Sequence, residues 1–303
     1  MSILTAIGNT PLIEISSLNP KKPSVKIFGK LEGANPGGSI KDRPAFSMIQ
    51  TAVRNGQLKQ GQTIIEATSG NMGIALVTIG AAMGYSVTLC MPECVSIERV
   101  KILEALGGHV ILTPAKLGTD GAIAKAEEIA VTDKEKYFHP NQFDNQWNWK
   151  AHYCTTGPEI LKQTDGCITH FVAGMGTTGT LMGVSRFIKE IRPDVRICGV
   201  EPVVGHKIQG LKNMTESKKP GIYDPNLLDS VISVNDDEAF EATRQLALKE
   251  GLFVGMSSGA AMVGALKIAS SIESGCVVAI FPDRGDRYLS TNLFKSFCSK
   301  CPP

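Results

Sequence analysis

The chain has 303 residues, of which 43% are hydrophobic and 20% charged, and its formal net charge is +2. This length and composition are typical of a globular protein that buries a large core without disulfide or metal support. The near-neutral charge argues against nucleic-acid binding. No secretory signal is visible, and no apolar run reaches the roughly 20 residues that span a bilayer, so we expect a cytoplasmic protein without membrane association.

Strand-like and helix-like runs alternate along the whole chain, which predicts an α/β fold. The continuous apolar strands indicate mostly parallel sheets covered by helices on both faces. A polar-aromatic stretch at residues 142–149 looks like a crossover between two lobes, with ligands expected in the cleft at the strand ends. In chain order, the expected elements are a helix from about residue 42 to 55, a strand at 63–67, a helix at 74–83, a strand at 86–91, a helix at 96–106, strands at 109–112 and 170–173, a helix at 180–191, a strand at 196–200, helices at 236–250 and from 255, and a strand at 277–281.

The first candidate functional segment, residues 35–43, leads glycines and a serine into the start of a helix. Pro44 is acceptable only in a first helical turn, so the helix should begin close to Asp42. Lys41 would then lie at a helix N-terminus, whose partial positive charge lowers the pKa of an amine and favours a nucleophile. A solvated surface lysine is the alternative interpretation.

A second segment, residues 66–73, places hydroxyls, an amide and two glycines between a strand and a helix. The unpaired backbone N–H groups of such a turn suit a carboxylate or a phosphate. An ordinary turn with a helix cap is equally compatible with this pattern.

The third segment, residues 174–180, follows a strand and precedes a helix, and its glycines and threonines have the form of a phosphate cradle. It partly matches the dinucleotide spacing, with Glu201 as the acidic residue, so a nicotinamide dehydrogenase stays open at this point.

A fourth segment, residues 255–261, opens an Ala-rich helix, and the Ser257 hydroxyl could meet a heteroaromatic nitrogen or simply cap the helix.

Metal chemistry receives little support from the sequence. The five histidines are scattered without metal-ligand spacing, and Cys298 and Cys301 form a CxxC pair without a second pair. A surface thiol pair is the expected state of these two cysteines, and a redox role is the alternative.

Taken together, the segments resemble the cysteine synthase family of fold-type II pyridoxal-phosphate (PLP) enzymes, whose fold is like that of the tryptophan synthase β subunit. The resemblance covers nearly the whole chain, and its motifs occur in the family's order. Such an ordered set is far more specific than any single motif. It rests on residues 7–12, 30–32, 35–43, 68–73, 91–92, 155–160, 174–180, 199–202, 257–259 and 287–290.

The resemblance implies a site as well as a fold. Lys41 looks like the lysine that forms a Schiff base with PLP and then moves the Cα proton, and Ser257 would face the pyridine nitrogen. Residues 1–40 and 146–303 would form a larger, PLP-holding lobe, and residues 41–145 a smaller mobile lobe. The other implied cofactor-binding residues are Asn71, Gly174, Gly176, Thr177, Thr178, Gly179 and Thr180, and the implied substrate-binding residues are Thr68, Ser69, Gly70, Met72 and Gln142.

The implied reaction is β-replacement on a small amino acid through an aminoacrylate. Residues 283–288 resemble B-type cysteine synthases, which use O-acetylserine and sulfide in cysteine biosynthesis. Met72 instead resembles the β-cyanoalanine synthase branch, which uses cysteine and cyanide and detoxifies cyanide. Both substrate pairs remain open.

Other functions are compatible with the same pattern. Within the fold, a serine or threonine dehydratase or a cysteine desulfhydrase would share Lys41 and the cradle. A non-catalytic alternative is a subunit that binds a serine acetyltransferase. The resemblance also implies a homodimer.

Overall fold

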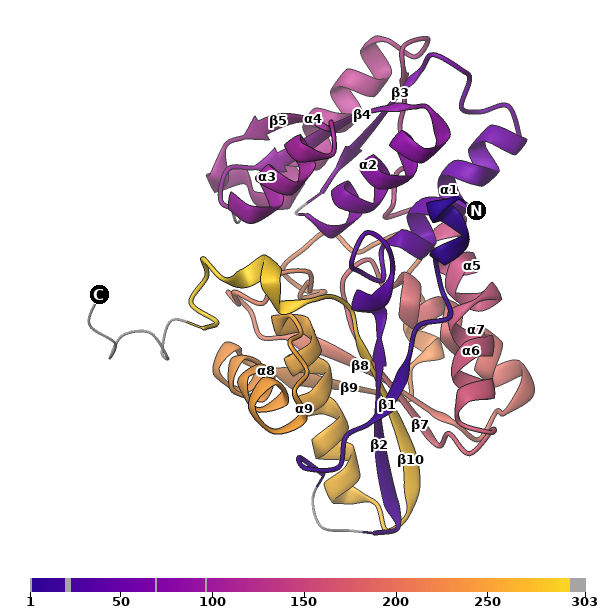
Figure 1. The fold of residues 1–303 in the computed structure, drawn as a ribbon, viewed down its shortest axis with the longest axis vertical. Coiled ribbons are helices and arrows are strands. Elements are labelled where there is room, and N and C mark those ends of the chain that lie inside the picture. The colour runs from indigo at the N-terminus through magenta and orange to yellow at the C-terminus, as the bar shows by residue number, and fades with distance from the viewer. Residues whose placement is uncertain (1, 20–22, 69, 96, 295–303) are drawn as a thin grey trace.

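Two β-sheets covered by helices form the framework of the computed structural model (Figure 1). The structure describes residues 2–19, 23–68, 70–95 and 97–294. The larger sheet has six strands in the order β1-β2-β10-β7-β8-β9, and the smaller has four in the order β5-β4-β3-β6. All neighbours pair in parallel except β1 and β2, so the predicted α/β class with mostly parallel sheets is confirmed.

The strands are short, and all but β6 have lengths usual in globular proteins. Their bounds are β1 Leu12–Glu14, β2 Val25–Leu31, β3 Thr63–Ala67, β4 Ser86–Pro92, β5 His109–Thr113, β6 Tyr137–Phe138, β7 His170–Gly174, β8 Arg196–Pro202, β9 Ser230–Val234 and β10 Gly275–Phe281.

The α-helices connect these strands. Their bounds are α1 Asp42–Arg54, α2 Asn71–Met83, α3 Ile97–Ala105, α4 Gly118–Thr132, α5 Gln146–Cys154, α6 Thr156–Gln163, α7 Gly179–Ile191, α8 Asp236–Glu250 and α9 Met256–Ser271. Short 3-10 turns lie at Ile3–Ala6, Glu32–Ala34, Ala115–Leu117, Pro225–Leu227 and Gly285–Tyr288.

The larger sheet is buried on both faces because successive side chains of a strand point to opposite sides. Along β10, Val277 and Ala279 pack with α8 and α9, whereas Val278 and Ile280 pack with residues of α6 and α7. Figure 1 shows α8 and α9 on one side of this sheet and α5, α6 and α7 on the other. The smaller sheet is covered in the same way, by α1 and α2 on one face and by α4 on the other.

Most of the predicted elements are present in the structure, and the structure also contains several helices and strands that the sequence did not predict. The helix predicted from residue 74 begins at Asn71, and the crossover predicted at 142–149 is shorter because α5 begins at Gln146. The elements without a predicted counterpart are β1, β2, β6, β9, α4, α5 and α6. In β2, Lys26 and Lys30 interrupt the apolar pattern, although Lys30 is fully buried.

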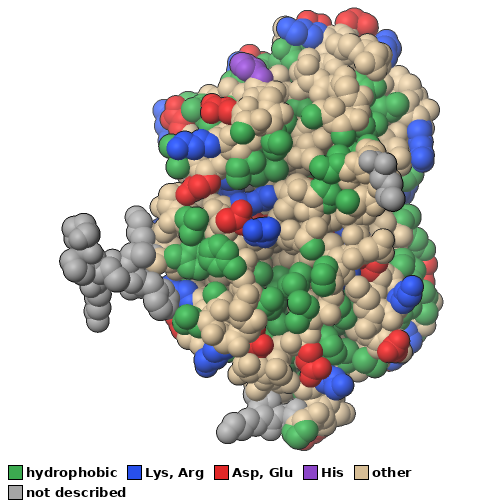
Figure 2. Space-filling model, in the orientation of Figure 1, with side chains coloured by type: hydrophobic (Ala, Val, Ile, Leu, Met, Phe, Trp, Pro, Cys, Tyr) green, Lys and Arg blue, Asp and Glu red, His purple; other side chains and the backbone are tan. Residues whose placement is uncertain are grey.

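Some predictions lie beyond what the structure tests. The lobe boundaries at residues 41 and 145 and the mobility of the smaller lobe stay predictions. Ser96, Cys298 and Cys301 lie outside the described residues. Among the described helices, none is long and apolar enough to cross a membrane. On the face shown in Figure 2, basic and acidic side chains are interspersed, in keeping with the small net charge.

A buried ionic network fixes the start of α1. The Arg43 guanidinium donates to Glu32 at 2.7 and 2.8 Å and to Glu159 at 2.6 and 2.7 Å. Lys30 donates to Glu159 at 2.7 Å. Burial would raise the pKa of Glu159, but hydrogen bonds and charge from Arg43, followed by Lys30, hold it at about 2. Two cations and two carboxylates therefore compensate one another in a largely buried network.

We expect Glu159→Gln to lower the free energy of unfolding by about 3 kcal/mol at neutral pH, because Arg43 and Lys30 would lose a charged partner. The folded-state pKa lies below the usual carboxyl value, so this stabilisation is present above about pH 5 and is lost as the pH falls through 4.5 toward 2. Urea denaturation of both proteins across this pH range measures the difference.

The matched control is Glu128→Gln, which alters an exposed Lys125–Glu128 pair and should change stability little. Equal losses in the two variants, or a difference that does not depend on pH, would contradict the assigned role of Glu159.

Candidate active site

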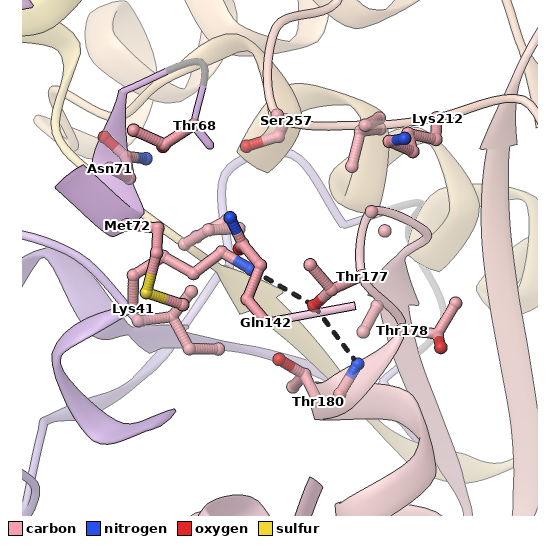
Figure 3. Close-up of a pocket in the computed structure, with 18 of the residues that line it drawn as sticks. Lys41, Thr68, Asn71, Met72, Gln142, Thr177, Thr178, Thr180, Lys212 and Ser257 are labelled. Atoms are coloured by element: carbon pink, nitrogen blue, oxygen red, sulfur yellow. Dashed lines mark hydrogen bonds between the residues drawn. The ribbon is translucent and has the colours of Figure 1, made fainter. Parts of the chain in front are cut away.

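One cavity collects residues from both sheets and from the helices that follow them (Figure 3). It is lined by twelve of the residues singled out from the sequence: Lys41, Thr68, Asn71, Met72, Gln142, Gly174, Gly176, Thr177, Thr178, Gly179, Thr180 and Ser257. Gly70 does not line the cavity, and Ser69 lies outside the described residues. Four segments far apart in sequence therefore meet at one place.

Lys41 is the N-cap residue of α1, directly before Asp42, and its side chain extends into the cavity. Its Nζ donates to the Thr177 hydroxyl at 3.3 Å. Burial lowers the pKa of Lys41 to about 8, because the charged ammonium loses its hydration. A substantial fraction of this amine is therefore neutral near pH 8 and can act as a nucleophile or a base.

The loop from β7 to α7 forms a cradle around one end of the cavity. Thr178 has a φ of 65°, an unusual conformation for a residue other than glycine, and it precedes the first turn of α7. A Cβ atom on Gly176 would lie 2.5 Å from the Gly210 carbonyl oxygen, and one on Gly179 would lie 2.0 Å from Asn148 Oδ1. Only glycine fits at either position, so the loop backbone itself can approach a ligand.

Side chains behind the cradle hold its threonines. Asn148 Nδ2 donates to the Thr177 hydroxyl at 3.2 Å. The fully buried His152 places Nε2 3.4 Å from Thr180 Oγ1 and Nδ1 2.9 Å from Thr156 Oγ1. Burial, and after it the charges of Arg43 and Lys41, lower the pKa of His152 well below its usual value, so the ring is neutral at physiological pH.

The segment after β3 and Gln142, which follows β6, present polar groups to the cavity (Figure 3). Thr68 Oγ1 accepts from the backbone N–H groups of Gly70 and Gly73 at 3.0 and 3.3 Å, which leaves its own O–H available to donate. Gln142 donates its side-chain N–H to the Ala67 carbonyl at 2.8 Å and is 3% exposed. These contacts orient two neutral hydrogen-bonding groups toward a ligand.

Ser257 and Met72 complete the predicted set. The N-cap of α9 is Gly255 and it has no side-chain capping bond, so the interpretation of Ser257 as a simple helix cap is wrong. Its hydroxyl lies within the first turn and faces the cavity (Figure 3). Met72 is 2% exposed, packs in the core of the smaller sheet and also lines the cavity.

Several cavity residues had no signal in the sequence. Lys212 is the most informative, because its Nζ lies 4.6 Å from the Phe143 ring centroid and 3.9 Å from Asp120 Oδ1, and burial lowers its pKa. It belongs to an irregular connection that carries no periodic pattern. The remaining lining residues are Ile40, Arg99, Thr119, Phe143, Ala173, Gly210, Leu211, Ile280 and Pro282.

The nicotinamide interpretation of the third segment fails at its acidic residue. Glu201 accepts from the Met214 backbone N–H at 2.5 Å and does not line the cavity, so it is not placed to bind a ribose there.

The donors in the cavity instead fit PLP. The Thr178 hydroxyl oxygen is buried and has no hydrogen-bond partner among the described residues, as expected of a donor reserved for an anion. Backbone N–H groups at the start of α7 add further donors for a phosphate. Lys41 offers an amine with a lowered pKa to the aldehyde.

Comparison with known proteins agrees with this geometry. Residues 3–283 match the family model described as pyridoxal-phosphate dependent enzyme. The chain is 47% identical over 300 residues to a cysteine synthase of Aquifex aeolicus, covering 97% of this chain and 92% of the relative. It is also 47% identical over 288 residues to cysteine synthase B of Escherichia coli, covering 95% and 94%.

Solved structures give the same result. An O-ureido-L-serine synthase superposes with a TM-score of 0.93 at 39% identity, covering 99% of this chain and 96% of that one. A hydrogen sulfide-producing enzyme from Fusobacterium nucleatum superposes with a TM-score of 0.90 at 40% identity, covering 95% and 99%. Matches of this length and identity, together with a cavity that fits the cofactor, show that the chain belongs to the family of pyridoxal-phosphate dependent enzymes.

Proposed function

We propose that the protein catalyses PLP-dependent β-replacement, converting O-acetylserine and sulfide to cysteine and acetate. The observation that carries this proposal is the buried amine of Lys41, whose pKa is lowered to about 8 and which lies 3.3 Å from a hydroxyl of the glycine-rich cradle. The cysteine synthases at 47% identity support this choice of substrates.

Bound PLP supplies an electron sink that stabilises the negative charge left when a Cα proton is removed. Lys41 is the residue placed to attach the cofactor and then to hold that proton. In the net reaction the Cβ–O bond breaks, acetate leaves with the electron pair, and a Cβ–S bond forms with sulfide. Lys41 returns the proton to Cα, so that the amine ends the cycle as it began.

The remaining residues orient and enclose the reactants. Thr177, Thr178 and Thr180 would hold the phosphate, together with the backbone of Gly174, Gly176 and Gly179. Thr68, Gly70 and Gln142 would bind the substrate carboxylate, Ser69 is assigned there by resemblance alone, and Asn71 would donate to the cofactor ring oxygen. Ser257 would face the ring nitrogen as a neutral partner. A neutral partner does not enforce protonation of the ring, and an unprotonated ring favours elimination of the β-group over transamination.

A second substrate pair, cysteine and cyanide, is favoured by Met72. Its thioether lines the cavity where a threonine hydroxyl is usual in cysteine synthases, so the carboxylate end of the cavity is less polar. The similar Fusobacterium protein is described as hydrogen sulfide-producing, and release of sulfide from cysteine is the first half of this alternative reaction. Dual activity would need no further residues. Under this proposal the enzyme would serve cyanide detoxification as well as cysteine biosynthesis.

Assembly and location stay predictions from the resemblance. We infer that the protein forms a homodimer, that it lies in the cytoplasm and that it binds a serine acetyltransferase. Gel filtration with and without the acetyltransferase tests the first and third of these points.

Lys41→Ala should remove the visible absorbance of bound PLP and lower β-replacement by more than roughly a thousandfold, because both attachment and proton transfer are lost. Circular dichroism should show an unchanged fold. Lys101→Ala, on the exposed side of α3, is the control and should keep both the band and the activity. Full activity in the Lys41 variant would refute the mechanism.

The rate at which PLP attaches to the apoprotein should rise with pH and level off above about pH 8. Below that pH the amine is mainly ammonium and has no free electron pair, and above it the neutral form dominates. Stopped-flow absorbance at several pH values measures the profile. An inflection near 10.5, the ordinary lysine value, would show that Lys41 is not perturbed.

Met72→Thr should raise kcat/KM for O-acetylserine relative to cysteine by roughly tenfold, because it restores a hydroxyl to the carboxylate end of the cavity. Steady-state kinetics with both donors gives the ratio. Met72→Leu keeps the volume and apolar character, so it should retain the parent ratio. An unchanged ratio in the threonine variant would remove Met72 as a determinant of the donor.

A further inference from the structure

The side-chain amide of Asn71 is held on both sides by residues near the end of the chain. Its Nδ2 donates to Asp283 Oδ2 at 2.6 Å, and its Oδ1 accepts from Arg287 Nη1 at 2.5 Å. Asp283 is 1% exposed and Arg287 5% exposed. A buried carboxylate therefore binds the nitrogen of this amide, and a buried guanidinium binds its oxygen.

This arrangement permits only one orientation of the amide. Exchange of the oxygen and nitrogen would turn the oxygen toward a carboxylate and the NH2 group toward a guanidinium, and both contacts would be repulsive. An amide nitrogen carries two N–H groups. Asp283 accepts from one of them, and the second has no acceptor among the described residues, so it is available to the cavity, into which Asn71 projects (Figure 3).

Asp283 and Arg287 are themselves held by further contacts. Asp283 Oδ2 also accepts from the Tyr288 hydroxyl at 2.5 Å, and Arg287 Nη2 donates to the Gly37 carbonyl in the loop that precedes Lys41. The Tyr288 ring lies 5.0 Å from the Arg99 guanidinium carbon of α3. Because Asp283 and Arg287 each have a further hydrogen-bond partner, a rotation of the Asn71 amide would not be matched by a movement of either charge. We infer that these surroundings set the orientation of Asn71.

We propose that Asp283 and Arg287 are positioning residues that act through Asn71: they present its second N–H to the cavity as a fixed donor for the ring oxygen of PLP. Arg287 also withdraws electron density from the amide oxygen, which strengthens the N–H as a donor. The inference rests on the proposed role of Asn71, and it adds two residues that do not line the cavity themselves.

Asp283→Asn tests the proposal. The variant keeps the shape, but its own NH2 group can face Asn71, so the Asn71 amide should occupy two orientations. In apoprotein labelled with 15N-asparagine, we expect the Asn71 NH2 resonances, assigned from their loss in Asn71→Asp, to broaden or shift and to exchange with solvent roughly tenfold faster. The dissociation constant for PLP, measured by equilibrium dialysis, should rise roughly tenfold.

Arg287→Lys is a second variant, which tests the same proposal if Asp283→Asn does not fold. It keeps the positive charge but loses the fork that reaches both Asn71 and Gly37, so its effects should fall between those of the parent and Asp283→Asn. Ser290→Ala is the matched control. It removes a hydrogen bond to Glu98 of α3 from the same terminal segment without touching Asn71, and should leave resonances and affinity unchanged.

Folded Asp283→Asn or Arg287→Lys protein with unchanged Asn71 resonances and unchanged PLP affinity would overturn the inference. So would equal changes in the Ser290 control, which would indicate a merely structural effect. Failure of the parent to bind PLP would instead refute the proposed function, and the resonances of the apoprotein would still report on the orientation of Asn71.

Discussion

The position of Lys41 depends on the burial of Arg43 two residues later. A guanidinium removed from water is strongly destabilising unless it is paired, and here Glu32 and Glu159 both accept from it. Glu32 follows β2 of the larger sheet and Glu159 lies in α6, which packs on that sheet, so the pairing of these charges ties the start of α1 to both. Lys41, two residues before Arg43, lines the cavity from this fixed helix start.

Several unfavourable features of the chain come together at the cavity. Thr178 adopts a positive φ, and its buried hydroxyl has no partner among the described residues. Lys41 is a buried amine that forms no ion pair with a carboxylate of the described residues, and burial lowers its pKa. Each of these features is unfavourable in isolation. Their concentration at one place is what a ligand-binding and catalytic site requires, because groups satisfied within the protein could not bind a ligand.

The sequence predicted those parts of the site whose signal is local. Residues 174–180 combine glycines and threonines between a strand and a helix, and resemblance to a known family assigned them a role. The supporting contacts could not be found in this way. Lys30 and Glu159 are 129 positions apart, and Asn71 and Arg287 are 216 apart, so no spacing within one element connects them. The burial of Lys30 in β2 could not be predicted either. A charged residue in a sequence indicates an exposed position unless the partner that compensates its charge is known.

The cradle would hold an anion almost entirely with neutral groups. Its threonine hydroxyls and backbone N–H groups carry no net charge, His152 behind them is neutral, and the charge of Arg43 is compensated by two carboxylates. A cationic side chain in the cradle would bind phosphate more strongly, but it would also repel an ammonium on Lys41 and change its pKa. Neutral donors would separate the two tasks: hydrogen bonds would orient the phosphate, and burial, which lowers the pKa of Lys41, would set the protonation of the lysine.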